Sequence, residues 1–78
     1  MTVVATFFIQ PKNTSLGWRA DVNGKIFTAM TVSVLRQSIA THLRSFLQKE
    51  TTISLDVRCR ENERKPWKFD VYRLTPNF

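Results

Sequence analysis

The chain has 78 residues, which predicts one domain over residues 1–78. A chain of this length buries too little of its surface to form a second hydrophobic core. Twelve lysines and arginines against six acids give a net charge of +6, which favours phosphate backbones and acidic surfaces as partners. Cys59 is the only cysteine, so an intrachain disulfide and the cysteine spacings of zinc modules are excluded. This cysteine usage favours a reducing compartment, and we expect a cytoplasmic protein.

The first apolar segment, residues 2–10, is predicted to be a core strand. No positive charge precedes it and Gln10-Pro11-Lys12 ends it, so it fits neither a signal peptide nor a membrane span. Its odd positions are all apolar, which places Phe8 on the opposite face of the strand. A ring exposed there can stack on a base or sit in a protein interface. A bulge or register change that buries Phe8 is the alternative.

Two further strands follow, over residues 18–22 and 25–30. They flank Asn23-Gly24, the strongest short hairpin signal in a sequence. Because short connections make neighbouring strands pair, we expect the first three strands to form an antiparallel meander. If the first strand lies at the edge of the sheet, two copies of the chain can pair through it.

A helix is predicted up to about Glu50, with Thr31 or Ser33 as its N-cap. At helical spacing its apolar residues fall within one arc, and the polar residues lie opposite. The helix should therefore bury one stripe, made of Val32, Leu35, Ile39, Leu43, Phe46 and Leu47.

The last third of the chain is predicted to be a hairpin, with strands at residues 51–60 and 67–74 around a charged loop. Apolar and polar residues alternate in the first of these strands, so one side should pack under the helix. Its apolar side consists of Ile53, Leu55, Val57 and Cys59. The order β-β-β-α-β-β predicts an α+β fold, a small antiparallel sheet with one helix packed on one face. The opposite face is left for solvent or a partner.

The sequence gives no arrangement of residues that suggests catalysis. His42 lies at the margin of the helix stripe, where packing by its ring is expected, and spacing identifies no partner for it. Cys59 lies on the apolar side of its strand, where burial makes a thiol unreactive. There is no glycine-rich phosphate loop. We therefore expect a binding protein rather than an enzyme, with no catalytic residue, metal or cofactor.

Basic residues are concentrated on the last hairpin, where Tyr72 shares a strand face with Lys68. Lysine and arginine neutralise phosphates, and an exposed ring among them can stack on an unpaired base. The sequence therefore predicts a small basic protein that binds DNA or RNA. Its expected binding residues are Arg58, Arg60, Arg64, Lys65, Lys68, Tyr72 and Phe8. Acids in the same region, Asp56, Glu61, Glu63 and Asp70, leave open that this is a solvated strand face held by ion pairs.

The alternative function is a protein-interaction module. Such a module would be an inhibitor, an antitoxin-like protein or an accessory subunit, of a kind that viruses also encode, and it would bind an acidic protein through the uncovered sheet face. Homodimerisation is compatible with both functions. No membrane association is expected.

In the order of its elements, the segment LGWRADVNGKIFTAMTVSVLRQSIATHLRSFL resembles two families, the arm-site DNA-binding domains of tyrosine recombinases and the HicB-like antitoxins. The first resemblance implies a sheet that reads the DNA major groove, and the second implies binding to a toxin. Neither family has the final hairpin, and no functional residue is carried over from either.

Overall fold

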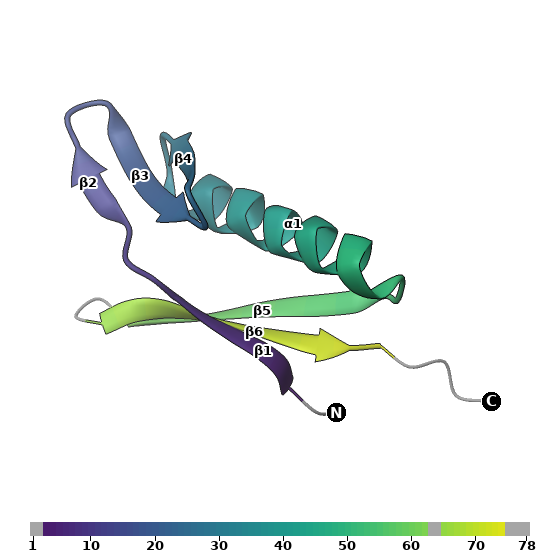
Figure 1. Ribbon diagram of the computed structural model, residues 1–78. Helices are drawn as coiled ribbons and strands as arrows, with labels where there is room; N and C mark the ends of the chain where they lie inside the picture. The colour runs from purple at the N-terminus through teal and green to yellow at the C-terminus, as the bar shows by residue number, and fades with distance from the viewer. Residues whose placement is uncertain (1–2, 63–64, 75–78) are drawn as a thin grey trace.

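The computed structural model describes residues 3–62 and 65–74 of the chain. Within these residues the chain forms six strands and one helix (Figure 1). In chain order they are β1 (Val3–Ile9), β2 (Lys12–Thr14), β3 (Gly17–Val22), β4 (Lys25–Ala29), α1 (Val32–Thr51), β5 (Leu55–Asn62) and β6 (Lys65–Arg73).

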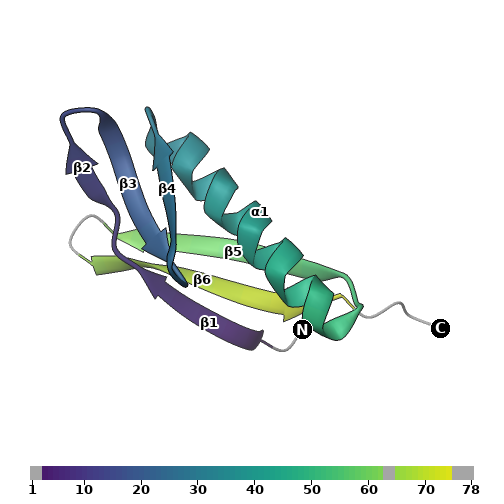
Figure 2. The same cartoon turned by 45° about the horizontal axis from the view of Figure 1, so that its top comes forward.

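The strands form two antiparallel sheets of three strands each. One sheet has the order β1-β6-β5, with β6 in the centre, and the other has the order β2-β3-β4. Helix α1 lies along one face of the first sheet, beside β4, as Figures 1 and 2 show. The predicted α+β class, with one helix on one face of a small antiparallel sheet, is confirmed.

The predicted pairing of the first strand is wrong. We expected the first three strands to form a meander within one five-stranded sheet, but β1 pairs with β6, and the short strand β2 takes the place beside β3. In the observed register Phe7 lies opposite Phe69 and Ile9 opposite Trp67. This pairing gathers large apolar side chains on one face, where the helix side of the sheet removes them from water.

Two turns depend on left-handed backbone. Asn23 (φ 51°) and Gly24 (φ 81°) form the predicted two-residue turn between β3 and β4. Gly17, at φ 118°, starts β3, and a Cβ there would lie 2.6 Å from the carbonyl oxygen of Ala29. A side chain at residue 17 would therefore force β3 and β4 apart.

Of the two predicted caps, Thr31 is the one that begins α1. Its hydroxyl accepts a hydrogen bond from the backbone N–H of Val34 at 3.3 Å, and its own backbone is extended. At the other end Thr52 adopts a left-handed conformation (φ 54°) and donates its N–H to the carbonyl of Gln48 at 2.8 Å. The helix thus ends within one residue of the predicted position.

The core lies between α1, the β3-β4 hairpin and the near face of the first sheet. Its buried cluster consists of Ile9, Ala20, Val22, Leu35, Ile39, Leu43, Trp67 and Phe69. As predicted, Leu55 is buried, and Val57 and Cys59 pack against the cluster. Two predicted core residues differ: Ile53 lies before β5, and Phe46 is 40% exposed. Phe46 stacks on His42 at the margin of the helix instead.

Candidate functional site: the open face of the first sheet

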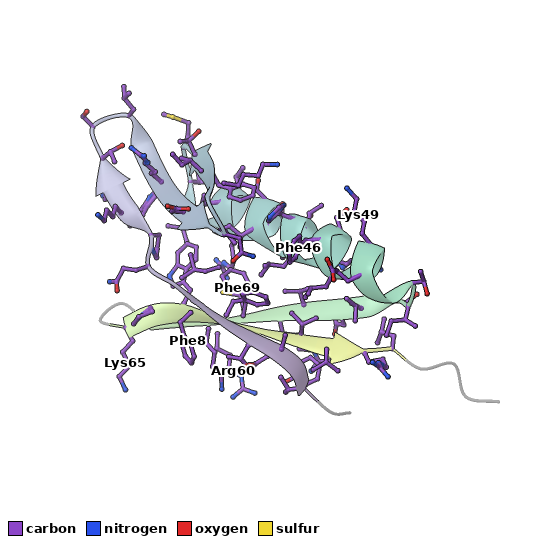
Figure 3. The ribbon with its side chains drawn as sticks, in the orientation of Figure 1. Phe8, Phe46, Lys49, Arg60, Lys65 and Phe69 are labelled. Atoms are coloured by element: carbon purple, nitrogen blue, oxygen red, sulfur yellow. The ribbon has the colours of Figure 1, made fainter. Side chains whose placement is uncertain are left out.

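The candidate site is the face of the β1-β6-β5 sheet that points away from α1, which we call the open face. Strand alternation sends Phe69 towards the helix and Lys68 to the opposite side. Figure 3 shows Phe8 and Arg60 projecting from this opposite side, away from Phe69. The open face comprises Thr6, Phe8, Asp56, Arg58, Arg60, Lys68, Asp70 and Tyr72.

One row of the open face crosses all three strands. Phe8 pairs with Lys68, and Lys68 pairs on its other side with Arg60. Phe8 is 69% exposed, and the side chains of Lys68 and Arg60 are 41% and 70% exposed. An aromatic ring and two cations therefore stand side by side, about 5 Å from strand to strand, and all are accessible.

The next row is centred on a buried carboxylate. Asp70 is only 2% exposed, although no described element covers the open face. The hydroxyl of Thr6 donates a hydrogen bond to its Oδ1 at 2.9 Å. Arg60 Nε and Lys68 Nζ lie 3.7 and 3.8 Å from its Oδ2. The stems of these neighbouring side chains shield the carboxylate, and their charges offset its own.

The third row pairs Asp56 with Tyr72, and both side chains contact Arg58, which stands opposite Asp70 in the second row. Arg58 Nε donates to Asp56 Oδ2 at 3.0 Å, and its guanidinium lies 5.2 Å from the centre of the Tyr72 ring. Tyr72 therefore shares the face of Lys68, as predicted, but one side of its ring is occupied by Arg58. Ion pairs engage both Asp56 and Asp70, as the alternative of a solvated strand face requires, but the partner of Asp56 lies on its own strand. The side chains of Glu61 and Glu63 lie outside the described residues.

The structure gathers most of the predicted binding residues on this face. Lys65, at the start of β6, is exposed and projects on the same side as Phe8 and Arg60 (Figure 3). Arg64 lies outside the described residues. The alternative of a buried Phe8 is wrong, because the one register shift between β1 and β6 falls between Val3 and Ala5 and leaves the later alternation intact.

His42 lies away from this face, packed by its ring as expected. Its imidazole lies 5.1 Å from the ring of Phe27 on β4 and 6.1 Å from that of Phe46. Burial, together with the positive charges of Lys25 and Lys49, lowers the pKa of His42 below its ordinary value of 6.5. Among the described residues, no group of three histidine, cysteine, aspartate or glutamate side chains could hold a metal ion.

The residues that sequence reasoning missed are those that complete the face. Thr6 is one of them: nothing in the sequence indicated that it would reach Asp70, 64 positions away in the chain. The alternation in both strands was visible, but their pairing was not. Without that pairing, Phe8 could not be placed beside Lys68.

Comparisons of the chain with protein-family models, curated proteins and solved structures found no match. Within the described residues, α1 is not apolar enough to cross a membrane. The open face is therefore the basis for a functional proposal.

Proposed function

We propose that the open face binds nucleic acid. Arg58, Arg60, Lys65 and Lys68 contact phosphates, and Phe8 stacks on a base. The observation that supports this most directly is the row in which an exposed phenyl ring stands in register with two exposed cations. A sheet that presents a ring among lysines and arginines offers both interactions that hold single strands, stacking and phosphate neutralisation.

The charge that this face presents to a ligand is positive. Asp70 is buried beneath its cations, and Asp56 is 31% exposed and engaged by Arg58. The cations are more accessible than the acids: the side chain of Arg58 is 59% exposed and that of Arg60 is 70% exposed. An approaching phosphate therefore meets guanidinium and ammonium groups first.

The exposed ring favours unpaired nucleotides. Bases in a duplex are already stacked on one another, whereas a base in a single strand can turn onto an aromatic side chain. In this proposal Phe8 supplies the platform. Tyr72 acts mainly by holding the guanidinium of Arg58, because that group covers one side of its ring.

The main test is the salt dependence of binding. Replacing Arg58, Arg60 and Lys65 by glutamine removes three cations but leaves Lys68 beside the buried Asp70. Log affinity for single strands should fall with log salt by about 0.7 per phosphate neutralised, so the triple variant should flatten this slope by about two units. Fluorescence titration of labelled single strands and duplexes at several salt concentrations measures the slope.

A matched control separates a site from general charge. Substituting Lys12, Arg19 and Lys25 by glutamine makes the same change in net charge on the second sheet, and this variant should keep most of the slope. Equal weakening by both triple variants would mean that no site exists on the open face. No binding by the wild type at about 50 mM salt would reject nucleic acid altogether.

Phe8→Ala tests the stacking contact. Loss of a stacked base costs about 1–3 kcal/mol, so single-strand affinity should fall roughly 5- to 150-fold. Duplex affinity should change little, because a duplex offers no free base. An equal loss for both ligands would contradict the assignment of Phe8 as a stacking platform.

The second candidate function is recognition of an acidic protein by the same surface. The exposed ring of Phe8 in the same row as Arg60 favours it, because aromatic residues and arginine are enriched in protein interfaces. In that case Phe8→Ala should weaken the complex far more than loss of the surrounding charges, which would mainly slow association.

A further inference from the structure

Strand β1 forms an edge of the first sheet. It pairs with β6 on one side, and on the other side Figure 2 shows no strand or helix of the described residues. Edge strands carry backbone N–H and C=O groups that can pair with another chain, and proteins commonly block them with lysine, proline or a bulge. The irregularity in β1 lies at its start, between Val3 and Ala5. The segment from Ala5 to Ile9 is regular.

β1 is also the one described strand without a charged residue. Its sequence is VVATFFI, whereas each of the other five described strands contains lysine or arginine. A second copy of a chain with net charge +6 would meet like charge at those other strands. At β1 it meets an uncharged, apolar edge. An acidic partner, by contrast, would be attracted to the open face rather than to this edge.

We propose that two copies of the chain pair antiparallel through β1, around a two-fold axis at Thr6. In this register each Thr6 lies opposite its counterpart, and Ala5 of each copy lies opposite Phe7 of the other. Phe8 of each copy then reaches the irregular start of β1, at Val4 of the other. Phe8 and Val4 are 69% and 46% exposed in the single chain, so the pairing brings two of the large apolar side chains that β1 exposes next to each other. The sheet is extended in its own plane, so the outward side of the Phe8 ring stays open to a ligand.

This arrangement joins the two β1-β6-β5 sheets into one. The two-fold axis is perpendicular to the sheet, so both helices lie on one side and both open faces lie on the other. The cations of β5 and β6 are separated from the axis by β1 itself. Like charges are thereby kept apart across the junction.

The first test is the oligomeric state. Sedimentation equilibrium over about 1 µM to 1 mM should show the average mass rising from that of one chain towards two. Thr6→Lys places two ammonium groups opposite each other at the axis and should keep the protein monomeric. Thr28→Lys, which adds the same charge to β4 in the other sheet, should dimerise like the wild type. A monomeric wild type, or equal dimerisation of both variants, overturns the proposal.

The second test fixes the register and remains decisive if Thr6→Lys fails to fold. Opposed Cα atoms in antiparallel strands lie about 4.5–5.5 Å apart, within disulfide range. In a Cys59→Ala background, Thr6→Cys should therefore cross-link to itself under mild oxidation. Thr28→Cys should remain monomeric. Cross-linking of Thr28→Cys as readily as Thr6→Cys would overturn the proposal.

Discussion

The two faces of the first sheet bury β6 by different means. Towards the helix, Phe69 and Val71 are 0% exposed beneath an apolar layer. On the open face Asp70 is almost equally buried, at 2%, but its cover consists of the side chains of Thr6, Arg60 and Lys68. One face is sealed by a second layer of structure, and the other only by its own side chains.

This difference separates stability from function. Burying a large apolar side chain contributes about 1.5–3 kcal/mol, whereas an ion pair at a solvated surface contributes about 0–1 kcal/mol. The helix side therefore holds the fold together. The cations of the open face can be rearranged or bound by a ligand at little cost, which suits a binding surface.

The largest expected effect comes from removing a ring on the helix side. Phe69→Ala should lower the free energy of unfolding by about 3–5 kcal/mol, because it leaves a cavity at the centre of the core cluster. Phe8→Ala, on the exposed side of the neighbouring strand, should change it by less than about 0.5 kcal/mol. Urea denaturation followed by circular dichroism measures both. Similar losses in the two variants would abolish the distinction between the faces.

A smaller effect is expected at the buried carboxylate. Asp70→Asn weakens the hydrogen bond from Thr6 and removes the charge that pairs with Arg60 and Lys68. It should therefore lower the free energy of unfolding by about 1–2 kcal/mol. Asp56→Asn, at the more exposed pair with Arg58, should cost about 0–1 kcal/mol.

The same substitution also bears on function. Asp70→Asn removes one negative charge from the open face, so affinity for single strands should rise even though the fold is weaker. Measuring the free energy of unfolding and the single-strand affinity on one preparation checks that the two change in opposite directions. Loss of affinity in a folded Asp70→Asn variant would mean that the carboxylate positions Arg60 and Lys68 for binding instead of merely offsetting their charge.

The smallest expected effect is a pH dependence of the free energy of unfolding, caused by His42 on α1. The pKa of His42 is lower in the folded chain than the ordinary 6.5, so the unfolded chain binds the proton more readily. The contribution of the neutral His42 to the free energy of unfolding should therefore be fully present above pH 6.5. It should be lost as the pH falls through 6.5 towards the folded pKa. In His42→Gln this step should disappear. A wild-type profile parallel to that of His42→Gln would show that the imidazole makes no contribution.

Much of this protein follows from local pattern. Alternation along residues 53–60 and 67–72 separated the apolar side chains from Arg58, Arg60, Lys68 and Tyr72, because successive residues of a strand point to opposite faces. Asn23-Gly24 predicted its hairpin, and the cap of α1 was narrowed to Thr31 or Ser33, since each depends on backbone geometry within a few residues.

Tertiary structure decided which strands meet. The pairing of β1 with β6 joins segments about sixty residues apart, and the choice rests on matching apolar faces beneath the helix rather than on any local signal. This one pairing brings Phe8 beside Lys68 and Arg60 and Thr6 onto Asp70. It also leaves the uncharged β1 at an edge. Most residues of the open face could be named from the sequence, but their assembly into one surface depended on long-range contacts that bury apolar side chains beneath the helix.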